Sequence, residues 1–141
     1  MSTLFMVHLV ATWFMVGVIW MVQVVHYPLM AHIGPGHSVA YQRMHVERMG
    51  ILVVPIMLAE IAAAILLCLF LPFETQSWAA WVGLGLLIVI WLVTALFSVP
   101  SHDVLVRRFD SEVHRRLVMS NIARVVLWTG RGVLATTMVA A

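Results

Sequence analysis

The sequence is poor in charged residues. Lysine is absent, and Asp, Glu and Arg together make up 10% of the 141 residues. Soluble globular domains usually carry about 25% charged residues, so this composition argues against one. The few charges form no basic patch with interleaved aromatics, no RNP motif and no zinc-finger spacing, which excludes nucleic acid as an expected partner. Hydrophobic residues make up 63% of the chain and the mean hydropathy is +1.03, which predicts an integral membrane protein in the lipid bilayer.

Cysteine is almost as scarce as lysine. The single cysteine, Cys68, excludes a disulfide within the chain. It lies in the run LLCLF, where we expect a buried bystander thiol rather than a nucleophile.

Four long apolar runs are present, each near the length of about 20 residues that crosses the hydrocarbon core of a bilayer. Pro28, Pro72 and Pro100 lie at the ends of the first three runs, and we expect them to stop the helices. The predicted fold is all-α, an integral membrane four-helix up-down bundle that forms one domain over residues 1–141. The predicted helices span residues 4–27, 41–71, 78–99 and 114–141.

The distribution of arginine predicts the orientation of this bundle. Arg43, Arg48, Arg107, Arg108, Arg115 and Arg116 flank the first and third loops, whereas the N-terminus, the loop around residues 72–76 and the C-terminus have none. By the positive-inside rule, the first and third loops are cytoplasmic and both termini lie on the other side. We therefore expect a multi-pass protein of the cell inner (plasma) membrane.

Three histidines from three helices are predicted at the cytoplasmic boundary. In an up-down bundle, His26, His45 and His102 lie at similar depth because odd and even helices run in opposite directions. Neutral imidazole is the commonest nitrogen ligand of metals, so the three could bind a transition metal, or two could bind haem b as axial ligands. Proton or quinone handling and simple hydration at the interface are alternatives. Residues expected to support this site or to bind substrate oxygen are Gln23, Arg48, Asn121 and Arg124.

A second polar group is predicted deeper in the membrane. At about 1.5 Å per residue, Glu60 lies about 22 Å from His45 along its helix, and Arg131 reaches a similar depth on the fourth helix. His8 and Thr12 come to the same half of the membrane from the first helix. A charge inside a bilayer is costly, so we expect Glu60 and Arg131 to form an ion pair between helices. The functional alternative makes Glu60 a metal ligand or a proton carrier.

Two resemblances extend these expectations. The stretch HLVATWFMVG resembles the first helix of the haem-containing protoporphyrinogen oxidase and copper-resistance membrane families, and that resemblance implies His8 as a haem ligand. The segments QVVHYP, ERMGILVVPIMLAE, VPSHDVL and NIARVVLWTGR are similar to a group of small four-helix bacterial membrane proteins. That similarity implies the topology and supplies no reaction.

These patterns predict a membrane-embedded oxidoreductase, or a redox subunit, that acts on a lipophilic substrate such as a quinone. Its expected cofactor is iron or copper, with zinc less favoured, or haem b, held by His26, His45 and His102. Two alternatives belong to other classes: a non-catalytic helical subunit of a homo-oligomer or larger membrane complex, and a small proton-coupled carrier that uses Glu60.

Overall fold

The computed structural model describes residues 2–70 and 77–140, and these residues form helices and short connections only. Four helical columns are present in this part of the chain, which confirms the predicted all-helical class. The first column is α1 (Ser2–Met21), the π-helix η1 (Val22–His26) and α2 (Tyr27–Met30). The second is α3 (Pro35–Phe70). The third is α4 (Ser77–Val93), the π-helix η2 (Thr94–Ser98) and α5 (Val99–Leu105), and the fourth is α6 (Ser111–Ala140).

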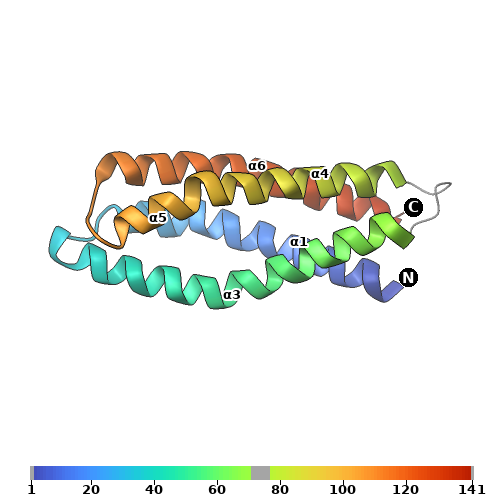
Figure 1. The fold of residues 1–141 in the computed structure, drawn as a ribbon, viewed down its shortest axis with the longest axis horizontal. Coiled ribbons are helices and arrows are strands. Elements are labelled where there is room, and N and C mark those ends of the chain that lie inside the picture. Colours follow the sequence, from blue (N-terminus) through green and yellow to red (C-terminus); the bar gives the residue numbers. More distant parts are fainter. Residues whose placement is uncertain (1, 71–76, 141) are drawn as a thin grey trace.

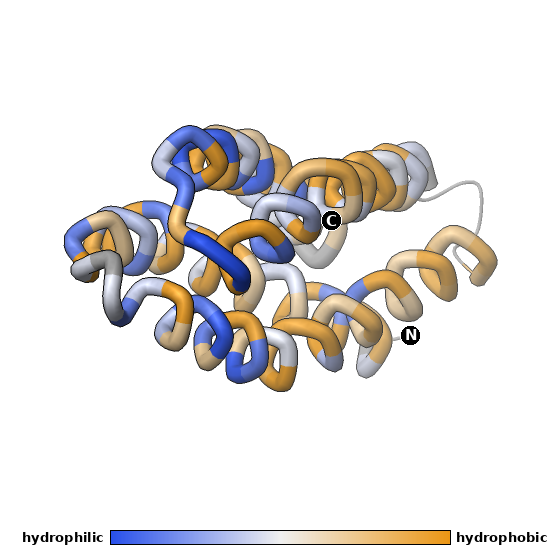
Figure 2. The backbone as a smooth tube through the Cα atoms, turned by 60° about the vertical axis from the view of Figure 1, so that its left-hand side comes forward, coloured by the Kyte–Doolittle hydropathy of each residue, from blue (hydrophilic) through white to orange (hydrophobic). Residues whose placement is uncertain are grey.

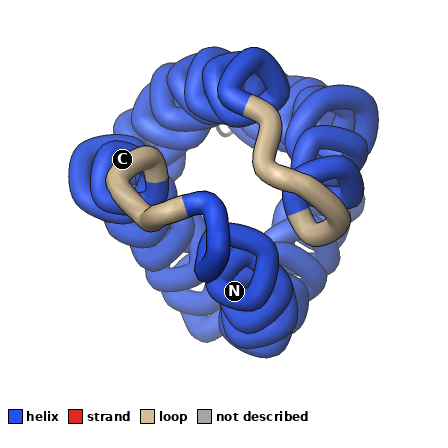
Figure 3. Tube along the Cα trace, turned by 90° about the vertical axis from the view of Figure 1, so that its left-hand side faces the viewer, coloured by secondary structure: helices blue, strands red, loops and turns tan. Residues whose placement is uncertain are grey.

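Neighbouring columns run in alternate directions, and both chain ends lie at one end of the molecule (Figure 1). The connections 31–34 and 106–110 lie at the other end, from which Figure 3 looks along the bundle. Helix α1 packs against α3 and α6, and α4 packs against the same two helices. Helices α3 and α6 are therefore diagonal to each other, and side chains that join them must cross the centre of the bundle.

The first and third columns continue through their prolines. A proline lacks an N–H and clashes with the carbonyl four residues earlier, so it normally ends a helix. Here a π turn precedes each one and changes the spacing between the proline and the carbonyls before it, and the helix continues through Pro28 into α2 and through Pro100 into α5. The first column consequently reaches Met30 and the third reaches Leu105, past the predicted ends at 27 and 99.

The second column begins earlier than predicted, at Pro35 instead of residue 41. Proline is favoured at the first position of a helix, and the polar residues that follow it are compatible with a helix that projects beyond the bilayer. Pro55 lies inside α3. The predicted stop at Pro72 and the predicted loop around residues 72–76 lie outside the described residues.

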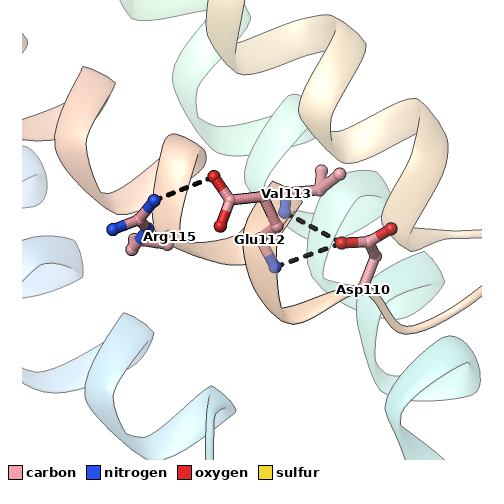
Figure 4. A network of polar contacts seen from close by, with 4 residues as sticks. All are labelled: Asp110, Glu112, Val113 and Arg115. Carbon is pink, nitrogen blue, oxygen red and sulfur yellow. Dashed lines mark hydrogen bonds and ion pairs between the residues drawn. The ribbon is translucent and has the colours of Figure 1, made fainter.

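Helix α6 begins with a side-chain cap (Figure 4). The carboxylate of Asp110 accepts hydrogen bonds from the backbone N–H groups of Glu112 and Val113, both at 3.1 Å, which satisfies two donors that have no partner within the helix. Arg115 donates to Glu112 at 2.9 Å one turn further on. The start of α6 at Ser111, slightly before the predicted residue 114, follows from this cap.

The surface of the bundle is largely apolar. Three helical stretches, Thr3–Met30, Gly36–Phe70 and Trp78–Leu105, are long and apolar enough to cross a membrane. Helix α6 is not among them, and it carries Asn121, Arg124 and Arg131 on its buried side. Figure 2 shows hydrophilic residues concentrated toward the end with the connections 31–34 and 106–110, and hydrophobic residues along the rest. This distribution fits a protein embedded in a membrane.

The interior combines an apolar core with a buried ion pair. The main cluster of buried hydrophobic side chains includes Met15, Ile19, Leu87, Ile90 and Trp128. Next to it, the diagonal helices α3 and α6 are joined by a salt bridge.

That salt bridge connects Arg131 to Glu60, whose side chains are 1% and 0% exposed, through Arg131 Nε and Glu60 Oε1 at 2.9 Å. Trp128 Nε1 donates to the other carboxylate oxygen at 3.2 Å, and Arg131 Nη1 donates to the carbonyl of Gly83 in α4. A side chain at position 83 would place its Cβ 3.3 Å from that guanidinium, so glycine permits the approach. Three helices are thus tied together by one arginine.

We predict that the Glu60–Arg131 pair is required for stability. The Glu60→Met variant leaves the Arg131 charge buried and unpaired, so the free energy of unfolding should fall by about 3–5 kcal/mol. The double variant Glu60→Met, Arg131→Met leaves no unpaired charge and should recover part of the loss. Denaturation in detergent micelles, followed by circular dichroism, measures both. The exposed pair of Arg115 and Glu112 gives the control, because Arg115→Ala should leave the unfolding transition unchanged. If Glu60→Met unfolds at the same denaturant concentration as the wild type, the prediction is contradicted.

Candidate functional site

The three predicted histidines lie side by side at the loop end of the bundle. His26 is the last residue of η1, His45 lies in α3 and His102 lies in α5. The rings of His26 and His45 are stacked, with centroids 4.1 Å apart and planes inclined by 19°. His102 continues the row, with its ring 5.5 Å from that of His45 and inclined by 37°. We call these three residues the histidine cluster.

The π turn η1 determines which neighbours the end of the first column contacts. A π turn holds one more residue than an α turn, so residues on its two sides do not follow a regular spacing of 100°. The structure turns His26 toward Tyr41 and His45 of α3, whereas Gln23 contacts Asn121 of α6. Gln23 and His26, which a regular helix places on one face, therefore contact different helices.

Two residues of α3 that the sequence analysis missed support the histidine cluster. The Tyr41 hydroxyl lies 3.4 Å from His26 Nδ1, and the two rings stack at 5.7 Å. The Gln42 side chain, 2% exposed, hydrogen-bonds through Nε2 to His102 Nδ1. This contact holds the side-chain amide of Gln42 against the His102 ring. The signal that could have found Gln42 is its position almost one turn before His45 in the segment YQRMHVER.

The histidine cluster has suitable donor atoms for a metal but not a convergent arrangement. His26 Nε2 is buried and has no hydrogen-bond partner within the described residues. The stacked rings of His26 and His45, however, place their nitrogens side by side, not on opposite faces of a haem. Across residues 2–70 and 77–140, no group of three His, Cys, Asp or Glu side chains is arranged to hold a metal ion. Coordination by these histidines would require the rings to reorient.

A cavity of about 190 Å³ adjoins the histidine cluster. Its walls are mostly apolar, with Met15, Ile19, Met49, Val53 and Met57 among them. The polar residues in the wall come from all four columns and are Tyr27, His45, Thr94, Ser98, His102 and Arg124. Pockets for drug-sized ligands measure about 300–1,000 Å³, so this cavity has room for part of such a molecule.

The cavity opens toward the outer surface of the bundle between α3 and the third column. Val46 and Val54 of α3 and Val99 of α5 line it and are 39%, 51% and 49% exposed. These residues belong to the exposed apolar surface of the bundle, so the mouth of the cavity is lined by apolar side chains.

Arg124 is the one cation in the wall of this cavity among the described residues. Its side chain is 7% exposed, its Nη1 lies 3.3 Å from Ser98 Oγ, and its guanidinium carbon lies 5.3 Å from the centre of the Trp128 ring. Its Nε is buried and has no hydrogen-bond partner within the described residues. The structure thus places a buried positive charge against an apolar cavity.

The other residues predicted to support the site have different positions. Asn121 is fully buried and donates to Gln23 Oε1 at 2.8 Å, which joins α6 to η1 away from the cavity wall. Arg48 is exposed and does not line the cavity. At 100° per residue it lies about 100° from the middle of the face formed by His45, Met49 and Val53. Of the four predicted residues, Arg124 alone reaches the cavity.

The predicted second polar group is also assembled. His8 and Thr12 are 4% and 0% exposed, and His8 lines a narrow gap with Arg131 that has no room for a water molecule. His8 Nδ1, Thr12 Oγ1 and Arg131 Nη2 are buried without hydrogen-bond partners in the described part of the chain. Within this group, Glu60 accepts hydrogen bonds from both Arg131 and Trp128.

Comparison of the chain with protein-family models, with curated proteins and with solved structures finds no match.

Proposed function

We propose that the chain is a membrane-embedded oxidoreductase, or a redox subunit, that acts on a lipophilic substrate held in the cavity. The observation that carries this proposal is the combination of an apolar wall, an opening toward lipid, and a polar end formed by His45, His102 and Arg124. Apolar walls with a few convergent polar groups are typical of sites for small molecules.

The polar end suits the chemistry of a redox-active head group. Reduction of a carbonyl-type head group takes up protons together with electrons, and its oxidation releases them. A neutral imidazole donates a proton from one ring nitrogen and accepts one at the other, so His45 and His102 can relay protons at the cavity wall. Gln42 holds the His102 ring in one orientation, and Arg124 can hold an oxygen of the substrate.

The same proposal includes a cofactor held by the histidine cluster: iron or copper, with zinc less favoured, or haem b. Such a group would supply the electron transfer. The support is the chemistry of the donor set and the unpartnered His26 Nε2, and a rotation of the rings is required for their nitrogens to converge.

We predict that the purified wild-type protein contains a stoichiometric transition metal or shows a Soret band, and that His45→Ala loses it because the central imidazole of the row is gone. The exposed His37 gives the matched control, and His37→Ala should retain the signal. Elemental analysis and a visible spectrum on one sample of each variant decide the question. Metal-free, colourless wild-type protein would exclude the cofactor.

The occupancy of the cavity can be tested with Gly50. Gly50 lies in the cavity wall and a Cβ added there meets nothing within 4 Å, so the backbone accepts a larger residue, and Gly50→Leu is designed to narrow the cavity. We predict that the wild type carries a co-purifying lipophilic molecule, seen as added mass in native mass spectrometry, and that Gly50→Leu loses it. Gly85→Leu, at an exposed helical glycine with equal space, should keep it. Equal retention by both variants would contradict a role for the cavity.

The orientation proposed from arginine places the connections 31–34 and 106–110 in the cytoplasm and both termini on the other side of the inner membrane, in an up-down bundle. The position of both chain ends at one end of the molecule supports it (Figure 1). A reporter enzyme that is active only outside the cytoplasm should be active when fused after Ala141. If a reporter that is active only in the cytoplasm is active at that position, the proposed orientation is wrong and the bundle is inserted the other way round.

A further inference from the structure

The environment of Arg124 narrows the substrate class. Its guanidinium is buried in an apolar part of the bundle, and Ser98, a neutral hydroxyl, is its hydrogen-bond partner there. Trp128 contributes its ring face on another side. Neither contact supplies a negative charge, although a buried charge is normally paired.

The carboxylates elsewhere in the described residues do not neutralise Arg124. Glu60 is bound by Arg131, and Asp110 and Glu112 pair with Arg108 and Arg115 near the start of α6. Glu47 and Asp103 are exposed. Within residues 2–70 and 77–140, the interior therefore holds two buried arginines and one buried carboxylate, which belongs to Arg131.

The two buried arginines provide an internal comparison. Arg131 adjoins a gap too narrow for water, and its positive charge is matched by Glu60. Arg124 adjoins a cavity of about 190 Å³ that opens to the lipid-facing surface, and it has no matching carboxylate among the described side chains. Of the two buried arginines, the one without a carboxylate partner, Arg124, is therefore the one that adjoins the open cavity.

Charge complementarity then determines what the cavity accepts. We infer that the substrate of this site is an anionic single-chain amphiphile, whose carboxylate- or phosphate-sized head binds Arg124 while its hydrocarbon tail leaves between Val54 and Val99. Tyr27, Ser98 and His102 line the cavity around this head group and offer further donors. The inference rests on the proposed function and adds the charge of the group that binds Arg124; a phosphate in that place anchors the molecule and is not itself oxidised or reduced.

The size and shape of the cavity favour a single chain. A volume of about 190 Å³ holds a small head group and the first methylenes of a tail, and the exposed valines at the opening provide an apolar path for the rest. A guanidinium forms two parallel hydrogen bonds with a carboxylate or a phosphate, which fixes the head group in one orientation.

The test compares matched probes on the full-length protein in nanodiscs of neutral phosphatidylcholine. The probes are palmitate, hexadecyl phosphate and methyl palmitate, which has the same tail and no charge, and equilibrium dialysis of labelled probes measures binding. We expect either anion to bind the wild type about tenfold or more tightly than the ester, the factor expected of a hydrogen bond to a charged group. Whichever anion binds more tightly identifies the head group.

Variants connect that preference to Arg124. Arg124→Gln should remove the difference between acid and ester, Arg124→Lys should retain part of it, and Gly50→Leu should weaken all three probes. Gly85→Leu is the control and should bind as the wild type does. The comparison of palmitate with methyl palmitate uses the wild-type protein alone. Poor folding of Arg124→Gln therefore does not affect that comparison.

The outcomes separate this inference from the proposed function. Equal binding of acid and ester to the wild type, reduced equally by Gly50→Leu, would overturn the anionic substrate and leave a lipophilic site. An anion preference that persists in Arg124→Gln would also overturn the inference. Absence of binding by all three probes would overturn the inference alone, whereas the proposed function is overturned by its own test, the co-purifying molecule and its loss in Gly50→Leu.

Discussion

The structure depends on one buried ion pair that crosses the bundle. Glu60 and Arg131 come from diagonal helices, so their salt bridge requires α3 and α6 to keep both their depth and their rotation. Trp128 adds a second bond from α6 to Glu60 in α3, and the carbonyl of Gly83 ties α4 to Arg131. With these three helices held in register at this level, the residues nearer the connections 31–34 and 106–110 come together without a direct ionic contact of their own. The histidine cluster and the cavity are formed in that part of the bundle.

Much of this arrangement follows from sequence because depth along a helix is a simple count of residues. The expectation that His26, His45 and His102 share a depth required only the helix limits and the alternating directions, and the rings do lie in one row. Glu60 and Arg131 could be matched by the same count, and the cost of an unpaired charge in lipid made their contact the simplest arrangement. Composition alone indicated an all-helical membrane protein, since the apolar runs are too long for most soluble helices.

Rotation about the helix axis was harder to predict. The π turns at 22–26 and 94–98 each shift the phase of the residues that follow, and no residue pattern marked them apart from the prolines just beyond. Gln23 and His26 therefore contact different helices, although a regular helix puts them on one face. Gln42 was missed because its one signal, a position almost one turn before His45, is shared with other polar residues of the segment YQRMHVER. Arg48 was included on depth alone, yet its direction takes it to the exposed surface.

The side opening of the cavity, between Val54 and Val99, changes what an affinity measurement on this protein means. A molecule that arrives through the hydrocarbon is first concentrated there, by about fourfold for each added methylene group. Most of its transfer free energy from water is gained in the bilayer, before any contact with the protein. A dissociation constant expressed as a concentration in water would then include this partitioning. A dissociation constant expressed as the mole fraction of the ligand in lipid would report the contribution of the protein itself.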